Sequence, residues 1–404
     1  MPKVVERGRL RITRSVLFRL IALLVIALPL SWYLPPQDNG FDGPLHLAER
    51  ILHGYTYFDE HISYWEEYQR NGHWYLAYSP MNSVVLMPYV ALGGSKLGMG
   101  FANGLIVTGS TILLWLLMRR ECMLRRWADL GAVAYFFGTP FLYGISAGTV
   151  WSLMHSEGNL FLLAALCLAQ RRRWAGCGFC YAVAIGCRSS LLFSVPLLLP
   201  LFLSGRNRSD YKRRLARRLF LLGQGALLPT AVMLLLQASM TGNPLLSPYQ
   251  VAWHQWGIVV PPVSTDYIRV NLHFYFLEMP LIQNTPPYVR FPPSGQAFWT
   301  VTPFMLLLVH ARLRSRLLQG ALLGAIGGFF GYLLYFYNGY MQYGSRYITD
   351  LFPFLVPLAF SSLSAYRVRP LKITVRALAF LLIALSIAIN VTVALMLHAG
   401  TLPT

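Results

Sequence analysis

Charged residues are scarce in this chain of 404 residues: they make up 12% of the sequence, whereas soluble domains carry about 25%. Acidic residues are scarcer still, because 15 Asp and Glu stand against 34 Lys and Arg, for a formal net charge of +19. Apolar residues make up 55%. This balance excludes an ordinary soluble domain and is typical of a membrane protein.

Signatures of nucleotide and zinc chemistry are also missing. The sequence contains no Walker A motif and no H-E-x-x-H. The five cysteines all fall in apolar runs or at their ends, and Cys177-x-x-Cys180 lies in an apolar run without further ligands. We therefore predict no disulfide framework and no zinc or redox centre.

The basic residues that are present are unevenly distributed. Of the 34, 27 fall in six clusters, at residues 3–19, 119–126, 171–173, 206–218, 312–316 and 367–376. Cytoplasmic loops of membrane proteins accumulate Lys and Arg, so the clusters mark the cytoplasmic side. They flank apolar runs and lack interleaved aromatic residues, which favours membrane lipid over nucleic acid as the partner.

The apolar runs between these clusters predict an all-α polytopic membrane protein with about eleven transmembrane helices. The run at 16–34 is too long for a signal peptide and is interpreted as a retained anchor with a cytoplasmic N-terminus. The segment 82–92 contains Pro88 and would invert the sidedness if it crossed, so we expect an interfacial or re-entrant helix there. Further spans are expected at 99–118, 130–145, 150–168, 174–187, 190–203, 219–239, 298–309, 317–337, 351–363 and 375–397.

No repeat or linker divides the chain, so residues 1–404 are expected to form one transmembrane domain. Two long segments, 35–98 and 240–296, fall on the outer side, and the first is expected to carry juxtamembrane helices. Seven basic residues lie outside the clusters, on this outer side among most of the acids: Arg50, Arg70, Lys96, Arg188, Arg269, Arg290 and Arg346. We interpret them as evidence for an anionic substrate bound at the outer face.

Acidic residues of the first outer segment are candidates for catalysis. Asp42 lies just after the first span and is placed to act as a general base, although it also precedes Gly-Pro and a helical run, which is typical of a helix cap. Both interpretations stay open. Asp59 and Glu60 could instead bind the acceptor or together hold a divalent cation. His155 and Glu157 lie in an apolar run, where ionisable residues usually have a function, and they are further candidates for contact with the acceptor or a metal.

The outer arginines are suited to phosphate, because a guanidinium donates two parallel hydrogen bonds. Arg346 lies between two spans, Arg188 at the tip of a tight hairpin, and Arg269 in the second outer segment. A polyprenyl phosphate presents its phosphate at this depth of the membrane. We therefore predict these three residues as the phosphate site.

Three stretches resemble the GT-C class of integral-membrane glycosyltransferases, the group with protein O-mannosyltransferases and the aminoarabinose transferase of lipid A. They are residues 42–54, residues 72–80 with 86–93, and residues 343–347 with 353–355. The resemblance implies that Asp42 is the catalytic base. The acid–Glu doublet common after the first span is Asp42-Gly43 here, so Asp59-Glu60 is the alternative. Within these stretches the candidates for sugar contact are His46, Tyr78, Tyr343 and Tyr347.

The resemblance also implies a reaction. We expect an inverting glycosyltransferase that moves a sugar from a polyprenyl-phosphate donor to a hydroxyl of a glycan, lipid or protein acceptor. The expected location is the inner (plasma) membrane, with the active site facing the periplasm or exterior. Two alternatives are a flippase or exporter of lipid-linked saccharide, and an oligosaccharide polymerase or ligase that uses a polyprenyl-diphosphate donor.

Overall fold

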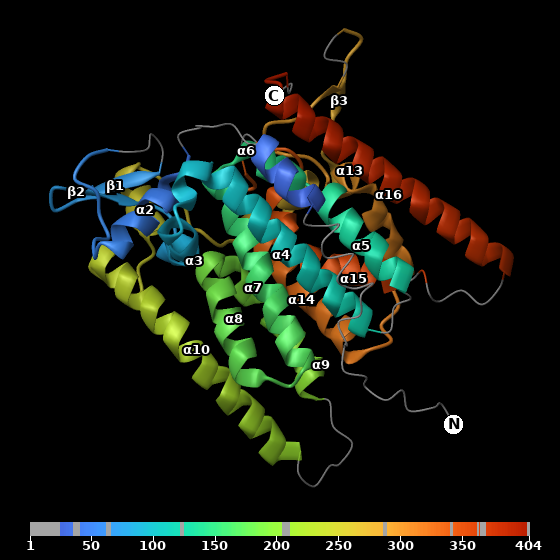
Figure 1. Ribbon diagram of the computed structural model, residues 1–404, viewed down its shortest axis with the longest axis horizontal. Coiled ribbons are helices and arrows are strands. Elements are labelled where there is room, and N and C mark those ends of the chain that lie inside the picture. The colour runs from blue at the N-terminus through green and yellow to red at the C-terminus, as the bar shows by residue number, and fades with distance from the viewer. Residues whose placement is uncertain are drawn as a thin grey trace.

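A bundle of long helices, with shorter elements gathered at its ends, makes up the protein (Figure 1). The computed structural model describes residues 25–34, 41–61, 66–121, 125–203, 211–285, 289–339, 342–361, 363 and 369–401. The basic start at 3–19 and residues 16–24 of the first apolar run therefore lie outside the described residues.

The helices of the bundle follow the apolar runs of the sequence. They are α4 (Gly98–Arg120), α5 (Arg125–Phe137), α6 (Phe141–Ala147), α7 (Val150–Gln170), α8 (Trp174–Cys187), α10 (Tyr211–Thr241), α14 (Arg316–Leu333), α15 (Phe352–Ser361) and α16 (Arg369–His398). Within the described ranges, five helical segments are long and apolar enough to cross a membrane. The chain is thus a multi-pass membrane protein, while the number of eleven spans stays a prediction.

Several expected spans are not single α-helices. The run expected at 130–145 is divided into α5 and α6 around Gly138-Thr139-Pro140. Proline-containing runs form 3₁₀ segments instead: η2 (Ser189–Leu197), continued by α9 (Leu198–Phe202), and η5 (Pro303–His310), preceded by α13 (Phe298–Val301). Pro196 lies inside η2, whereas Pro303 is in the first turn of η5, where its missing backbone donor is tolerated.

Glycines allow the closest helix contacts of the bundle. A Cβ on Gly178 of α8 would lie 1.9 Å from the carbonyl oxygen of Leu222 in α10, and one on Gly225 would lie 1.8 Å from that of Ala175. Small residues let membrane helices approach backbone to backbone. Only 6% of the most apolar 18-residue stretch of α10 is buried inside the protein. This helix therefore packs against the bundle on one side and is exposed on the other.

The first outer segment is more structured than predicted. It contains α2 (Gly43–Leu52), the antiparallel hairpin β1 (Glu67–Arg70) and β2 (His73–Leu76), and α3 (Pro80–Ala91), followed by η1 (Gly94–Leu97). A helix is therefore present where one was expected at 82–92, while its position at the membrane interface stays a prediction. The hairpin was not expected; Asn71 and Gly72 form its turn at positive φ of 51° and 82°, as a two-residue hairpin requires.

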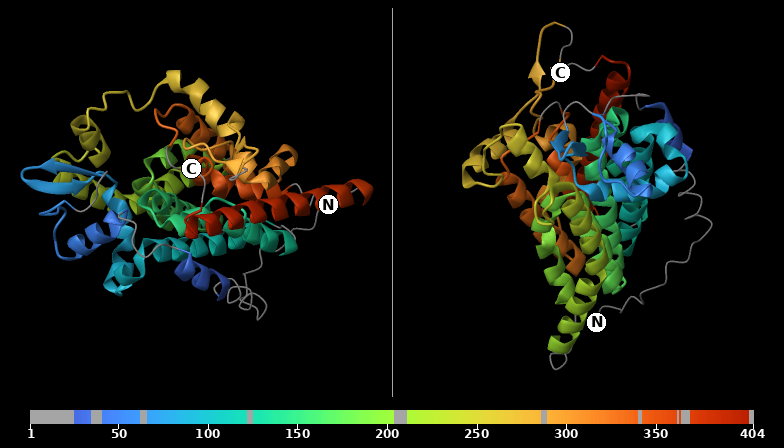
Figure 2. Two further views of the ribbon diagram at one scale, coloured as in Figure 1. Left: turned by 90° about the horizontal axis from the view of Figure 1, so that it is seen from above. Right: turned by 90° about the vertical axis from the view of Figure 1, so that its left-hand side faces the viewer.

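The second outer segment packs against the first. It contains α11 (Pro248–Gln255), η3 (Thr265–Tyr267), α12 (Ile268–Leu272), η4 (His273–Leu277) and the hairpin β3 (Leu281–Ile282) and β4 (Val289–Arg290). Gln255 of α11 exchanges side-chain bonds with the backbone of Gln69 at 2.7 and 3.1 Å. Figure 2 shows both segments grouped at the same end of the bundle, while β3 and β4 project from it. The segments are therefore placed to cover one end of the helices.

Candidate functional site

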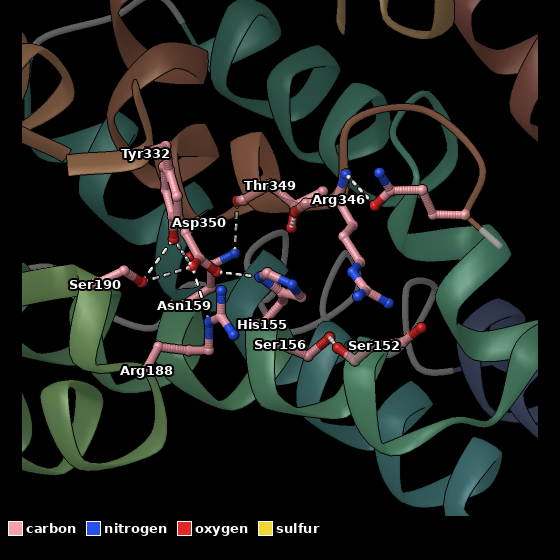
Figure 3. Close-up of polar contacts among 11 residues, drawn as sticks. Ser152, His155, Ser156, Asn159, Arg188, Ser190, Tyr332, Arg346, Thr349 and Asp350 are labelled. Atoms are coloured by element: carbon pink, nitrogen blue, oxygen red, sulfur yellow. Dashed lines mark hydrogen bonds and ion pairs between the residues drawn. The ribbon is translucent and has the colours of Figure 1, made fainter. Parts of the chain in front are cut away.

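A partly open pocket of about 60 Å³ lies where the starts of α6 and α7 meet the loop before η6 (Arg346–Leu351). Its lining combines aromatic rings with polar groups and a single guanidinium. Among the lining residues are Trp151, Ser152, His155, Tyr343, Arg346 and Thr349. Figure 3 shows the polar side chains at and next to the pocket, which come from α7, from the segment with Arg188 and Ser190, from Tyr332 of α14 and from the 346–350 segment.

The Arg346 guanidinium lies between two aromatic rings. Its carbon is 5.4 Å from the ring centre of Trp151 and 5.4 Å from that of Tyr347. Among the residues that the structure describes, no carboxylate lies within ion-pair distance of it. A cation that is held by ring faces and lines a pocket can accept an external anion.

The Arg188 guanidinium differs from that of Arg346, because the Asp350 carboxylate already neutralises its positive charge. Arg188 Nε donates to Asp350 Oδ2 at 3.1 Å, and Asp350 is fully buried. Tyr332 and Ser190 also donate to this oxygen. Buried charges are tolerated when they are paired and hydrogen-bonded in this way. Arg188 therefore belongs to a network beneath the pocket, next to Tyr347, whose ring lies 5.4 Å from its guanidinium carbon.

His155 joins this network to the pocket. Its Nδ1 lies 2.6 Å from Asp350 Oδ1, and the same ring lines the pocket beside Arg346. One turn further along α7, Asn159 Nδ2 donates to the carbonyl oxygen of Thr349 at 2.8 Å. These bonds fix the 346–350 segment against α7.

Asp42 occupies the N-cap position of α2 but makes no capping hydrogen bond with its side chain. The carboxylate faces His46 instead, with 3.3 Å between Oδ2 and Nε2. The hydrogen bond from His46 lowers the pKa of Asp42, against an opposing effect of partial burial. The preceding Phe41 packs its ring 4.9 Å from that of Trp151, so the base predicted from the sequence adjoins the pocket wall.

Glu66 is a second acid near this pocket, and it was not a leading candidate from the sequence. It is 4% exposed, and its Oε1 has no hydrogen-bond partner among the described residues. Burial raises the pKa of Glu66 well above its usual value, while the Arg346 guanidinium acts to lower it. Glu66 therefore lies close enough to Arg346 for the two charges to interact.

Other predicted residues lie elsewhere. Asp59 is 65% exposed and forms a surface pair with Arg50 at 3.1 Å and with His73 at 3.4 Å, and Glu60 is exposed beside it. Arg269 is exposed on α12. Within the described contacts, none of these three residues meets the pocket. Their assigned roles are thus not supported by proximity.

The remaining candidates are buried. Glu157 accepts a hydrogen bond from Asn82 of α3 at 2.5 Å, so it connects α7 to the first outer segment rather than to the pocket. Tyr347 packs centrally, with its ring 5.7 Å from His155. Tyr343 lines the pocket, and Tyr78 packs 5.5 Å from Tyr249 of α11.

The sequence contains one further catalytic pattern, which the structure explains differently. Residues 144–148 match G-x-S-x-G, the pattern around a hydrolase nucleophile. That pattern needs a strand-to-helix turn, whereas Ser146 lies within α6, is buried and donates to the carbonyl oxygen of Ala394. We assign Ser146 a structural role.

No protein-family model and no curated protein sequence matches the chain. Solved structures do match it. ArnT from Cupriavidus metallidurans bound to undecaprenyl phosphate is 16% identical with a TM-score of 0.56, covering 91% of this chain and 62% of that one. The Archaeoglobus fulgidus oligosaccharyltransferase in the apo form is 13% identical with a TM-score of 0.50, covering 92% and 56%.

A further structure gives the same result. AglB from Archaeoglobus fulgidus, in complex with an inhibitory peptide and a dolichol-phosphate, is 15% identical with a TM-score of 0.50, covering 97% of this chain and 57% of that one. The chain has the GT-C fold. It spans 56% to 62% of the length of these three structures, and at this identity the likeness concerns the fold alone. The GT-C resemblance of its sequence motifs is therefore confirmed at the level of fold.

Proposed function

We propose that this protein transfers a sugar from a polyprenyl-phosphate donor to an acceptor hydroxyl at the outer face of the membrane. The observation that carries the proposal is Arg346, a cation without a counter-ion among the described residues, in a pocket at the end of a membrane bundle. Structures of the same fold contain undecaprenyl phosphate or dolichol-phosphate, which supports a ligand of that class.

The proposed reaction is a single displacement. The acceptor oxygen attacks the anomeric carbon, the bond from that carbon to the phosphate oxygen breaks, and the phosphate keeps the electron pair. Asp42 takes the acceptor proton, and Arg346 stabilises the charge that develops on the phosphate. A single displacement inverts the anomeric configuration. Arg188 contributes by fixing Asp350 and Tyr347 beside the pocket.

Two matched variants test the proposal in purified protein with radiolabelled polyprenyl-phosphate hexoses and pentoses. Asp42→Asn should abolish sugar release but leave binding of the lipid phosphate nearly unchanged, because the amide keeps the shape and cannot take a proton. Arg346→Gln should weaken binding of the lipid phosphate, since a charge-assisted hydrogen bond contributes about 1.5–3 kcal/mol. Arg290→Gln, at an exposed strand position, is the control.

The outcomes separate the proposal from its rivals. Activity that survives in Asp42→Asn would remove Asp42 as the base and direct attention to Glu66. Donor binding that depends on Arg346, without release to any acceptor, would favour a flippase or exporter. Release only from a diphosphate donor would favour the polymerase or ligase reaction.

A further inference from the structure

The imidazole of His155 has one nitrogen that the buried network does not use. His155 is 2% exposed, and its Nδ1 lies 2.6 Å from Asp350 Oδ1. Its Nε2 has no partner among the described contacts, although the ring lines the pocket. Figure 3 shows the ring between Asp350 on one side and the Arg346 side chain on the other. The unused nitrogen therefore faces the space next to the proposed phosphate ligand.

The surroundings of His155 decide which nitrogen carries the proton. Asp350 is bonded to the Arg188 guanidinium through Oδ2, so its carboxylate acts only as an acceptor. The hydrogen in the contact with His155 therefore belongs to Nδ1.

The charges around the ring favour a neutral imidazole. Two cations, Arg188 and Arg346, flank it, and Asp350 is the anion that contacts it. A charged imidazole would be a third cation in a buried site, which is costly. In the neutral form with hydrogen on Nδ1, the Nε2 atom presents a lone pair to the pocket.

The geometry points to a hydroxyl-binding site: His155 Nε2 accepts a hydrogen bond from a sugar hydroxyl of the ligand whose phosphate Arg346 binds. A lone pair repels phosphate oxygens and attracts a hydroxyl hydrogen. Arg346 would therefore bind the phosphate of a glycosyl phosphate, and His155 would bind its sugar. This inference rests on the proposed function in taking a glycosyl phosphate as the ligand. The hydroxyl belongs to the sugar of the donor, and the experiment would reveal an acceptor hydroxyl in its place.

The test compares binding of a short-chain polyprenyl phosphate, with and without an attached hexose or pentose, to the purified full chain. No acceptor is present. Wild type should bind one of the glycosylated ligands about ten-fold more tightly than the bare phosphate, a difference of 1.4 kcal/mol. His155→Phe keeps a ring without an acceptor and should lose this preference while its affinity for the bare phosphate stays unchanged.

Ser156→Ala is the matched control, because Ser156 Oγ donates back to the carbonyl oxygen of Ser152 in the same helix. It should behave as wild type. An undiminished preference in His155→Phe would overturn the inference. Loss of the bare phosphate affinity as well would also overturn it, since His155 would then be structural.

Deoxy ligands in the wild-type protein provide a test that needs no variant to fold. Removing the hydroxyl that His155 binds should abolish the preference. If no donor hydroxyl matters and His155→Phe raises only the KM for the acceptor, the inference is overturned and the hydroxyl at Nε2 is the acceptor's. No effect on either substrate overturns the inference. Absence of sugar transfer with the binding preference intact would instead count against the proposed function.

Discussion

At the scale of single residues, two arginines with similar surroundings in the sequence differ in the structure, because among the described residues a carboxylate neutralises only one of them. Arg188 and Arg346 both lie apart from the basic clusters. In the structure Arg188 is bonded to buried Asp350, whereas Arg346 lies on aromatic rings with no carboxylate at ion-pair distance among the described residues. Because binding an anion is most favourable where a charge is uncompensated, we expect Arg346 to be the better phosphate ligand.

The proposed base also has a partner that can be tested. The hydrogen bond from His46 is the largest cause of the lowered pKa of Asp42, and burial acts against it. A base must be ionised, so activity is lost as the pH falls through this pKa. His46→Ala should raise the pKa of Asp42 and move the acidic limb of the kcat/KM profile to higher pH.

The measurement is the initial rate of sugar release as a function of pH, in the wild type, in His46→Ala and in a control variant. His53→Ala is the control, because His53 is exposed at the end of the same helix. An acidic limb that stays in place in His46→Ala would indicate that a group other than Asp42 sets it.

Residues of the pocket were predictable from the sequence only where a simple pattern marked them. Arg346 and Arg188 stood out because they break the clustering of basic residues. Asp350 was missed, since its partners Arg188 and His155 are 162 and 195 positions away. A signal was present, however: an acid four residues after Arg346 in an otherwise apolar run is costly unless it is paired.

At the scale of elements, run length predicted most helix positions. The expected span 174–187 coincides with α8, and 150–168 matches α7 within two residues. The 3₁₀ segments η2 and η5 were not predicted, because apolar composition does not distinguish them from α-helix. The hairpin of β1 and β2 was missed although Asn71-Gly72 is a strong turn signal. Its strands have four residues each, too short for alternation to be evident.

The contact between α8 and α10 depends on two glycines, which gives a prediction for stability. In Gly225→Ala the new methyl group would lie 1.8 Å from the carbonyl oxygen of Ala175, so the helices must separate. Overpacking of this kind costs about 1–3 kcal/mol. Thermal unfolding in detergent should therefore show a lower midpoint for this variant.

Gly223→Ala provides a closely matched control for that measurement. Gly223 lies two residues away on the same helix, and a Cβ there meets nothing within 4 Å. It should unfold at or above the wild-type temperature, because alanine favours helix over glycine. Equal midpoints for the two variants would contradict close packing of α8 against α10.

At the scale of the whole molecule, the two outer segments form one unit. Besides the contact of α11 with β1, Tyr68 donates to the carbonyl oxygen of Met240 at the end of α10. Tyr78, in the link between β2 and α3, packs against Tyr249 of α11. Segments separated by more than a hundred residues thus enclose the same end of the bundle, where Asp42, Glu66 and Arg346 lie. The sequence indicated their common side through the distribution of basic residues, but not their mutual contacts.

This arrangement predicts which end faces the exterior. Basic clusters are retained on the cytoplasmic side, so the loop at 312–316 should face the cytoplasm and the second outer segment the exterior. Val259 is 82% exposed and Leu313 is 41% exposed, so both positions can carry a reactive cysteine. In intact cells, a membrane-impermeant maleimide should label Val259→Cys, whereas Leu313→Cys should react only after permeabilisation. The unsubstituted protein gives the background.

The reverse labelling pattern would place the pocket on the cytoplasmic side. A polyprenyl-phosphate donor would then have to be used before it crosses the membrane, and the proposed reaction at the outer face would be wrong.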